Sequence, residues 1–287
     1  MGRVKRTLAP YLLVLPGGLW LLMFFAVPMA TMLSLSLQEG DIVNGYVFTG
    51  HWQTYIEAIS DYETQLIRSL VYGVIATIIL IVLAFPAAYW IAFYGGRRKS
   101  TYLFLLLLPF FVSFVLRTIS WRLILTDDGF LLHPLKQAGL LPENFHILGT
   151  SAAVIGGLVY NFLPFMVLPI YVALERIDPR VVEAARDLYA SPVTAFRKVI
   201  LPLALPGVFA GVLMTFIPVS SDYVNSEVLG SSSTTMIGQV IQSQYLSSSN
   251  YPTASALSFT LMAVLLVGVF SYAKALGTED VMKVAAR

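Results

Sequence analysis

The chain of 287 residues has no cysteine, and charged residues make up only 12% of it. Without cysteine it can form neither disulfide bonds nor thiolate metal sites. Its three histidines, His51, His133 and His146, are too scattered for a metal site. Charged residues make up about a quarter of a typical soluble domain. The composition therefore excludes an ordinary soluble globular protein.

The sequence also lacks the motif of a nucleotide-binding loop, GxxxxGK followed by Ser or Thr. The chain therefore cannot hydrolyse ATP through such a loop. Its apolar segments contain no cluster of His, Glu and Asp that a membrane-embedded enzyme would need. We therefore expect no enzymatic activity, no metal, no cofactor of its own and no nucleic-acid partner.

Long apolar runs dominate the chain, which is 57% hydrophobic. Each run is long enough to cross a bilayer as a helix, which takes about 20 residues. Six spans are predicted, at about 11–36, 67–94, 102–121, 151–174, 203–223 and 253–275. Prolines interrupt several of these spans. Membrane helices tolerate the kink that proline causes where they surround a water-filled pathway. The prediction is an all-α polytopic membrane protein with a single transmembrane domain, 1–287.

Lysine and arginine are concentrated at one side of these spans. Short cytoplasmic loops retain such residues, so both termini are predicted to be cytoplasmic. The cations of this side are Arg3, Lys5, Arg6, Arg97, Arg98, Lys99, Arg176, Arg180, Arg186, Arg197, Lys198, Lys274, Lys283 and Arg287. On the opposite side, Lys136 is the one clear loop cation. The other charged loop residues of that side are the acids Glu39, Asp41, Glu57, Asp61, Glu63, Asp127, Asp128 and Glu143.

The longest predicted cytoplasmic loop, 175–202, contains two helix-start signals. Asp178 precedes Pro179, and Ser191 precedes Pro192. Asp and Ser favour the N-cap position, and proline favours the first helical position. The loop is therefore predicted to be a helix-turn-helix at the membrane surface.

The residue pattern of this loop resembles the EAA loop of ABC importer permeases. The matching residues are Glu183-Ala184-Ala185, followed by Ala190, Phe196, Leu201-Pro202 and Pro206-Gly207. Similarity to the polyamine (spermidine and putrescine) permease subfamily extends along nearly the whole chain. It is carried by Pro109-Phe110 with Arg117, Gly157-Leu-Val-Tyr160, Leu163-Pro-Phe-Met166, Leu168-Pro-Ile-Tyr171, Phe216-Ile-Pro218 and Met236-Ile-Gly238.

The resemblance implies a type I ABC importer permease fold in a bacterial inner membrane. It also implies four kinds of neighbour: a second permease in a heterodimer, two ATPase subunits that bind ATP and Mg, an external solute-binding protein, and membrane lipid. The implied ATPase-coupling residues are Glu183, Ala184, Ala185, Asp187, Tyr189, Ala190 and Ser191.

Tyr189 departs from the family pattern, which usually has glycine at this turn. A bulky residue at positive φ is strained by roughly 1 to 2 kcal/mol. Either the turn is built differently here, or the tyrosine fills a pocket on its own ATPase.

Ionisable groups within membrane spans are costly and point to function. Arg117 and Asp222 each lie about 22 Å along their predicted helices, so a direct contact is one hypothesis and a solvated Arg117 the other. Asp222 and Glu227, with Tyr223 and Asn225 between them, would suit a flexible cation, although an ordinary polar rim is the alternative. The predicted pathway residues are Asp222, Glu227, Tyr223, Arg117, Trp121, Tyr160 and Asn161. For Asn161, a hydrogen bond between helices is favoured.

Two further questions stay open at this point. The segment 233–247 is either a short amphipathic helix or a serine-rich loop. The solute is either a polyamine or a sugar or phosphorylated polyol, and the acids around the fifth span favour the cation. An ion-coupled secondary transporter would show two related halves and midplane carboxylates, and the sequence shows neither.

Overall fold

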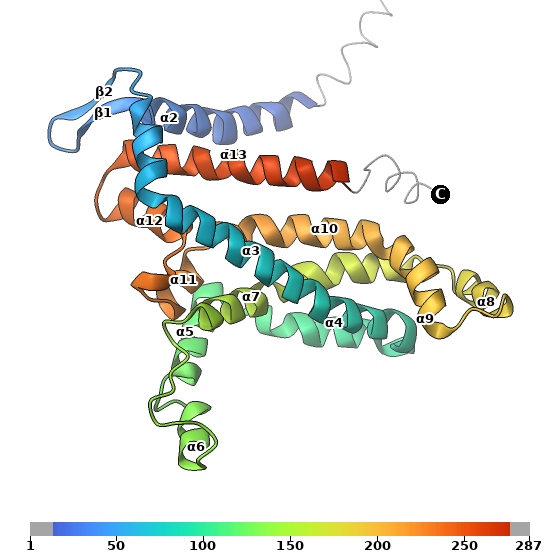
Figure 1. The fold of residues 1–287 in the computed structure, drawn as a ribbon. Coiled ribbons are helices and arrows are strands. Elements are labelled where there is room, and N and C mark those ends of the chain that lie inside the picture. Colours follow the sequence, from blue (N-terminus) through green and yellow to red (C-terminus); the bar gives the residue numbers. More distant parts are fainter. Residues whose placement is uncertain (1–13, 276–287) are drawn as a thin grey trace, which may run out of the picture. The chain divides into compact units, whose positions relative to one another are not determined.

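The computed structural model describes residues 14–275, which are mostly helical (Figure 1). They divide into two compact units, which we describe separately. Unit 1 comprises 14–63 and 241–262, and unit 2 comprises 64–240 and 263–275. Residues 11–13 of the first predicted span and both charged termini lie outside the described residues.

Unit 1 contains an apolar helix, Val14–Leu35, and a β-hairpin that the sequence analysis did not predict. The helix includes the π-helical turn η1 (Leu22–Ala26) and α2 (Val27–Leu35). The hairpin pairs β1 (Gln38–Asp41) with antiparallel β2 (Gly45–Phe48), with Gln38 opposite Phe48. The unit also takes in the start of α3 (Gln53–Tyr94), most of α12 (Ile237–Leu246) and the first part of α13 (Tyr251–Ala275).

Unit 2 holds the remaining elements and a continuous apolar core. They are η2 (Gly96–Arg98), α4 (Lys99–Leu107), η3 (Leu108–Phe111), α5 (Phe114–Leu125), α6 (Leu132–Gln137), α7 (Ser151–Glu175), α8 (Pro179–Asp187), α9 (Pro192–Ala195), η4 (Phe196–Ile200), α10 (Leu201–Ser220), α11 (Val224–Leu229) and η5 (Ser232–Thr234).

Helices α7 and α10 lie against each other and form the centre of this core (Figure 1). Two glycines allow the approach: a Cβ on Gly207 would lie 2.6 Å from the Pro169 carbonyl oxygen, and one on Gly211 would lie 2.6 Å from Met166 Sδ. Small residues four apart are a common means of bringing membrane helices together. Because α7 is held this way, its buried polar side chains have fixed positions.

Within residues 14–275, five helices are long and apolar enough to cross a membrane, and there are six spans if a bent pair of helices is counted as one. The bent pair corrects the prediction of one uninterrupted third span at 102–121. The helix breaks between Phe111 and Phe114 and turns by 85°. Pro109 starts the short η3 turn, and Val112 and Ser113 then take extended backbone angles, so the helical hydrogen-bond ladder is interrupted.

Other boundaries differ from the predicted ones at polar helix ends. Helix α3 begins at Gln53, not near 67, because a polar helical segment precedes its apolar run and joins it at a kink at Tyr62. Helix α10 ends at Ser220, so Asp222 follows the helix rather than lying inside it. In the segment 233–247, the helical alternative is confirmed by α12.

Candidate functional site

The loop at 175–202 forms the predicted helix-turn-helix, and both predicted N-caps are confirmed. The Asp178 side chain accepts a hydrogen bond from the Arg180 backbone N–H at 2.9 Å, and Pro179 opens α8. Ser191 Oγ accepts one from the Thr194 backbone N–H at 3.2 Å as α9 begins. Each cap satisfies a backbone donor that the first helical turn leaves unpaired.

The turn after α8 has the geometry that glycine usually provides, although its residue is Tyr189. The Tyr189 N–H donates to the Arg186 carbonyl at 2.9 Å, and the Ala190 N–H donates to the Ala185 carbonyl at 3.0 Å. These two bonds define a Schellman motif, which places the residue after the cap in the left-handed region. Tyr189 has φ of 60°. The alternative in which the turn is built differently is therefore wrong.

One side of the loop is attached to unit 2 and the other side is exposed. Val182 and Phe196 pack against the core, and the Phe196 ring lies 5.5 Å from that of Phe85. Leu188 and Tyr189, by contrast, are 82% and 99% exposed. The exposed coupling residues predicted from the sequence are Glu183, Ala184, Asp187, Tyr189 and Ser191, whereas Ala185 and Ala190 are half-buried. An exposed apolar tip on a fixed loop is typical of a docking surface.

Replacing Tyr189 with Gly tests whether the tyrosine is retained for contact. We expect the variant to relieve a backbone strain of roughly 1 to 2 kcal/mol and yet to lose apolar contact area with the ATPase subunit that the sequence resemblance implies. ATPase co-purification with the permease should therefore fall, while the thermal stability of the isolated permease stays equal or rises. If co-purification and coupling improve instead, the tyrosine is only a tolerated strain.

The predicted pathway residues Asp222 and Asn161 belong to one buried hydrogen-bond network. Asp222 Oδ1 accepts from the Asn225 backbone N–H at 2.7 Å and from Asn225 Nδ2 at 3.2 Å. Asn161 Nδ2 donates to Asn225 Oδ1 and to Thr118 Oγ1, each at 3.1 Å. The network joins α5, α7 and the start of α11. The favoured role of Asn161, a hydrogen bond between helices, is confirmed.

Asp222 and Glu227 have different surroundings. Asp222 is buried, 8% exposed, and bonds to the backbone where α11 begins. Glu227 and Tyr223 are exposed on and just before α11. A carboxylate at a helix start also stabilises the helix through its dipole. Asp222 therefore has a structural role, its role in the pathway stays a prediction, and Glu227 is the accessible carboxylate of the two.

The hypothesis of a direct contact between Arg117 and Asp222 is wrong. Among the described residues, no carboxylate lies within ion-pair distance of Arg117. Its guanidinium instead lies 4.2 Å from the centre of the Phe110 ring, and its Nε and Nη1 are buried without a protein partner in the described part of the chain. The depth estimate assumed a straight helix, and the 85° bend between η3 and α5 invalidates it.

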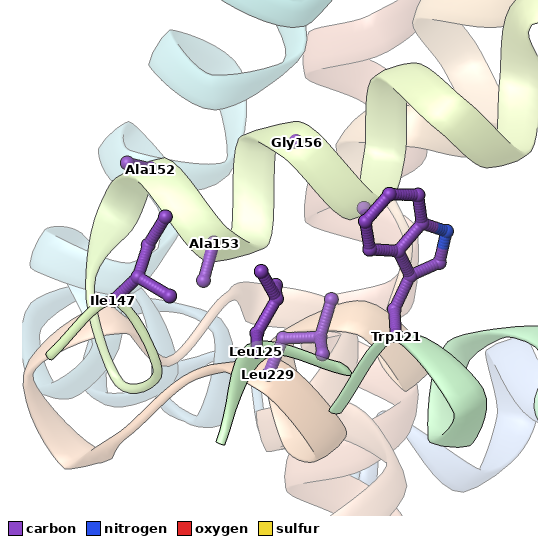
Figure 2. Close-up of a pocket in the computed structure, with 8 residues that line it drawn as sticks. Trp121, Leu125, Ile147, Ala152, Ala153, Gly156 and Leu229 are labelled. Atoms are coloured by element: carbon purple, nitrogen blue, oxygen red, sulfur yellow. The ribbon is translucent and has the colours of Figure 1, made fainter. Parts of the chain in front are cut away.

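Tyr160 lies beside Arg117 and packs against Trp121, which lines an apolar cavity. The Trp121 and Tyr160 rings are 5.2 Å apart, and Tyr160 is 6.0 Å from the Arg117 guanidinium. The cavity has a volume of about 190 Å³ and is lined by Trp121, Leu125, Ile147, Ala152, Ala153, Gly156, Gly157 and Leu229 (Figure 2). This lining contains no carboxylate. The cavity could accept an aliphatic segment, but it provides no anionic partner for a cation.

Three residues of the site had no predicted role in it: Asn225, Thr118 and Gly157. Asn225 connects Asp222 to Asn161, and a Cβ on Gly157 would lie 2.6 Å from Asn225 Oδ1. The only signal in the sequence was a polar residue or glycine within or beside an apolar run. That signal does not reveal which helices approach each other.

Comparisons with known proteins show to which family the chain belongs. Residues 66–275 match the family described as "Binding-protein-dependent transport system inner membrane component". The spermidine/putrescine transport system permease protein PotB of Haemophilus influenzae is 35% identical over 257 residues, which cover 89% of this chain and 90% of that protein. The inner membrane ABC transporter permease protein YdcU of Escherichia coli is 34% identical over 230 residues, 76% of this chain and 72% of that protein.

Among solved structures, a bacterial ABC transporter involved in the import of alginate has the same fold. It superposes with a TM-score of 0.73 at 18% identity, covering 96% of this chain and 97% of that chain. That likeness confirms the predicted type I ABC importer permease fold and carries no information on the solute. The matched family model spans every element from the apolar part of α3 to α13. The chain therefore belongs to the family of binding-protein-dependent transport system inner membrane components.

Proposed function

We propose that this chain forms half of the pathway through which an ATP-driven importer moves a polyamine cation. The observation that carries the proposal is 35% identity, over 89% of the chain, to a permease named for spermidine and putrescine transport. The accessible carboxylate of Glu227 and the aromatic ring of Tyr223, both exposed near the end of α10, support a cationic solute. Carboxylates and aromatic faces attract ammonium groups by charge and by cation–π contact.

The loop from α8 to α9 is the proposed contact with a separate ATPase subunit, which would bind ATP and Mg. Support comes from its fixed inner side and from the exposed Glu183, Leu188 and Tyr189. The complete importer would contain a second permease, two ATPase subunits and an external binding protein. The grouping of cations favours cytoplasmic termini, and the acidic loops would then face outward.

The likeness to the alginate importer gives no reason to prefer a sugar, because identity of 18% reflects the shared fold. An anionic sugar polymer would also be repelled by exposed carboxylates such as Glu227. A neutral sugar or a phosphorylated polyol therefore stays the alternative that experiment has to exclude.

A solute screen on the reconstituted importer tests the proposal. The permease pair, the ATPase and the binding protein are assembled in vesicles, and ATP hydrolysis is measured with single solutes. We expect spermidine or putrescine to stimulate hydrolysis severalfold, with neutral sugars and phosphorylated polyols leaving the basal rate unchanged. Vesicles that lack this subunit are the control. Stimulation by a sugar with no response to polyamines would contradict the proposed solute.

A further inference from the structure

The start of α3, before the kink at Tyr62, exposes a row of large apolar side chains. Trp52, Ile56 and Ile59 are 66%, 70% and 41% exposed. They are four and three residues apart, so they lie along one side of the helical turn. We call these three residues the apolar stripe. Nothing in the fold of the described residues covers it, although burying apolar side chains is favourable.

A different side of the same helix is fixed to unit 1. Ala58 is buried there, at 2% exposed. The Tyr55 hydroxyl and Ser36 Oγ share a hydrogen bond of 2.7 Å, and Gln244 Nε2 in α12 donates to the Tyr62 hydroxyl at 2.7 Å. The helix therefore has a fixed orientation within its unit, and that orientation leaves the apolar stripe outside the core.

These contacts place the start of α3 at the end of the first membrane span. Ser36, the partner of Tyr55, directly follows the span Val14–Leu35. The His51 backbone N–H also donates to the Leu37 carbonyl at 3.1 Å. The apolar part of α3 is the next span along the chain, so the connection between the two spans begins and ends at the same membrane surface. The apolar stripe therefore lies at the level where the bilayer meets water.

We propose that the apolar stripe is an interfacial membrane anchor, which inserts among the lipid headgroups and the first part of the acyl chains. Interfacial helices bury their apolar side about 5–10 Å into this boundary, and tryptophan is enriched there. At Tyr62, φ of −119° and ψ of 18° interrupt the helical geometry. The anchor can therefore follow the surface while the apolar part of α3 crosses the membrane. The inference goes beyond the proposed function and holds for any solute.

The charges of this segment define the kind of lipid contact. Residues 36–67 contain no lysine or arginine, so attraction to anionic headgroups cannot hold the segment, and apolar burial has to do so. The acids Glu57 and Asp61 are exposed, and Asp61 is about 140° around the helix from Ile56. Glu63, where the spacing would continue the stripe, follows the kink. The two acids can therefore stay in water while the stripe is in lipid.

The two flanking spans bring lipid to this level of the chain, which favours the bilayer over a protein as the occupant. Because the chain has no cysteine, Ile56→Cys gives it one site for an environment-sensitive dye. The labelled permease complex is reconstituted in phosphatidylcholine vesicles whose acyl chains carry bromine close to the headgroup, and the labelled parental complex supplies the background. Relative to vesicles without bromine, we expect the emission to fall by about twofold or more.

Asp61→Cys is the matched control, because Asp61 is exposed on the same helix but on another side. Its dye should keep a water-like emission and lose little intensity to bromine. Equal, weak quenching at the two positions would overturn the anchor. A dye at position 56 that is blue-shifted but unaffected by bromine would show that a protein covers the stripe, which would also overturn it.

A second variant tests whether the isoleucines hold the segment in lipid. The dye is placed at the first position of the stripe by Trp52→Cys, alone and together with Ile56→Ser and Ile59→Ser. We expect the serine pair to reduce the bromine quenching by about twofold or more, because the remaining apolar area is too small to stay inserted. Unchanged quenching with the serine pair would show that these side chains do not anchor the segment.

Discussion

Importers that carry Glu183→Lys are expected to lose solute-stimulated ATP hydrolysis and uptake by about tenfold or more, while membrane insertion stays intact. Glu183 is exposed on α8 and has no ion pair among the described residues. Its charge is therefore free to meet cationic groups on the proposed ATPase subunit. Charge reversal replaces attraction with repulsion at the contact, and such changes commonly cost 2 kcal/mol or more, roughly a 30-fold loss.

A matched reversal at Asp128 controls for net charge in this experiment. Asp128 is also exposed and has no ion pair in the described part of the chain, but it lies in the segment between α5 and α6, far along the sequence from α8. Asp128→Lys should keep solute-stimulated hydrolysis near the parental rate. Unaltered transport by the Glu183→Lys importer would refute the assignment of the coupling surface.

The second large effect is expected from removing the two carboxylates near the end of α10. The double variant Asp222→Asn with Glu227→Gln keeps size and hydrogen-bonding capacity but removes both charges. A carboxylate about 4 Å from an ammonium group contributes on the order of 4 kcal/mol at an effective dielectric near 20, before desolvation is subtracted. Polyamine uptake should therefore fall about tenfold or more, while protein abundance and basal ATPase activity persist.

The single variants separate the two carboxylates by their surroundings. Glu227 is exposed, so Glu227→Gln should weaken uptake most at low salt, where attraction is least screened. Asp222 is buried and bonds to Asn225, so Asp222→Asn should lower uptake with little salt dependence. Glu143→Gln, an exposed acid between α6 and α7, is the control. Parental uptake by the double variant at low and high salt would exclude both residues from the pathway.

Much of the architecture could be predicted, because membrane spans and helix caps are determined by residues that are close together in the sequence. Apolar runs predicted most of the spans, and the Asp178-Pro179 and Ser191-Pro192 pairs predicted the starts of α8 and α9. The positive φ at Tyr189, which the sequence left as one of two alternatives, is also a local property, set by the helix cap. In each case the free energy that stabilises the local structure comes from residues a few positions apart. The sequence pattern alone is therefore enough to predict it.

The details of the site depended on contacts between distant segments. The 85° bend after Pro109 separated Arg117 from its expected place, and the approach of α7 to α11 at Gly157 brought Asn225 to Asn161. Hydropathy reports that a residue is apolar or polar, and not which helix it faces. By itself, the sequence determined most of the membrane spans, the starts of α8 and α9, and the family. Only the tertiary structure decided which polar groups are paired, because pairing is set by packing between elements far apart in the chain.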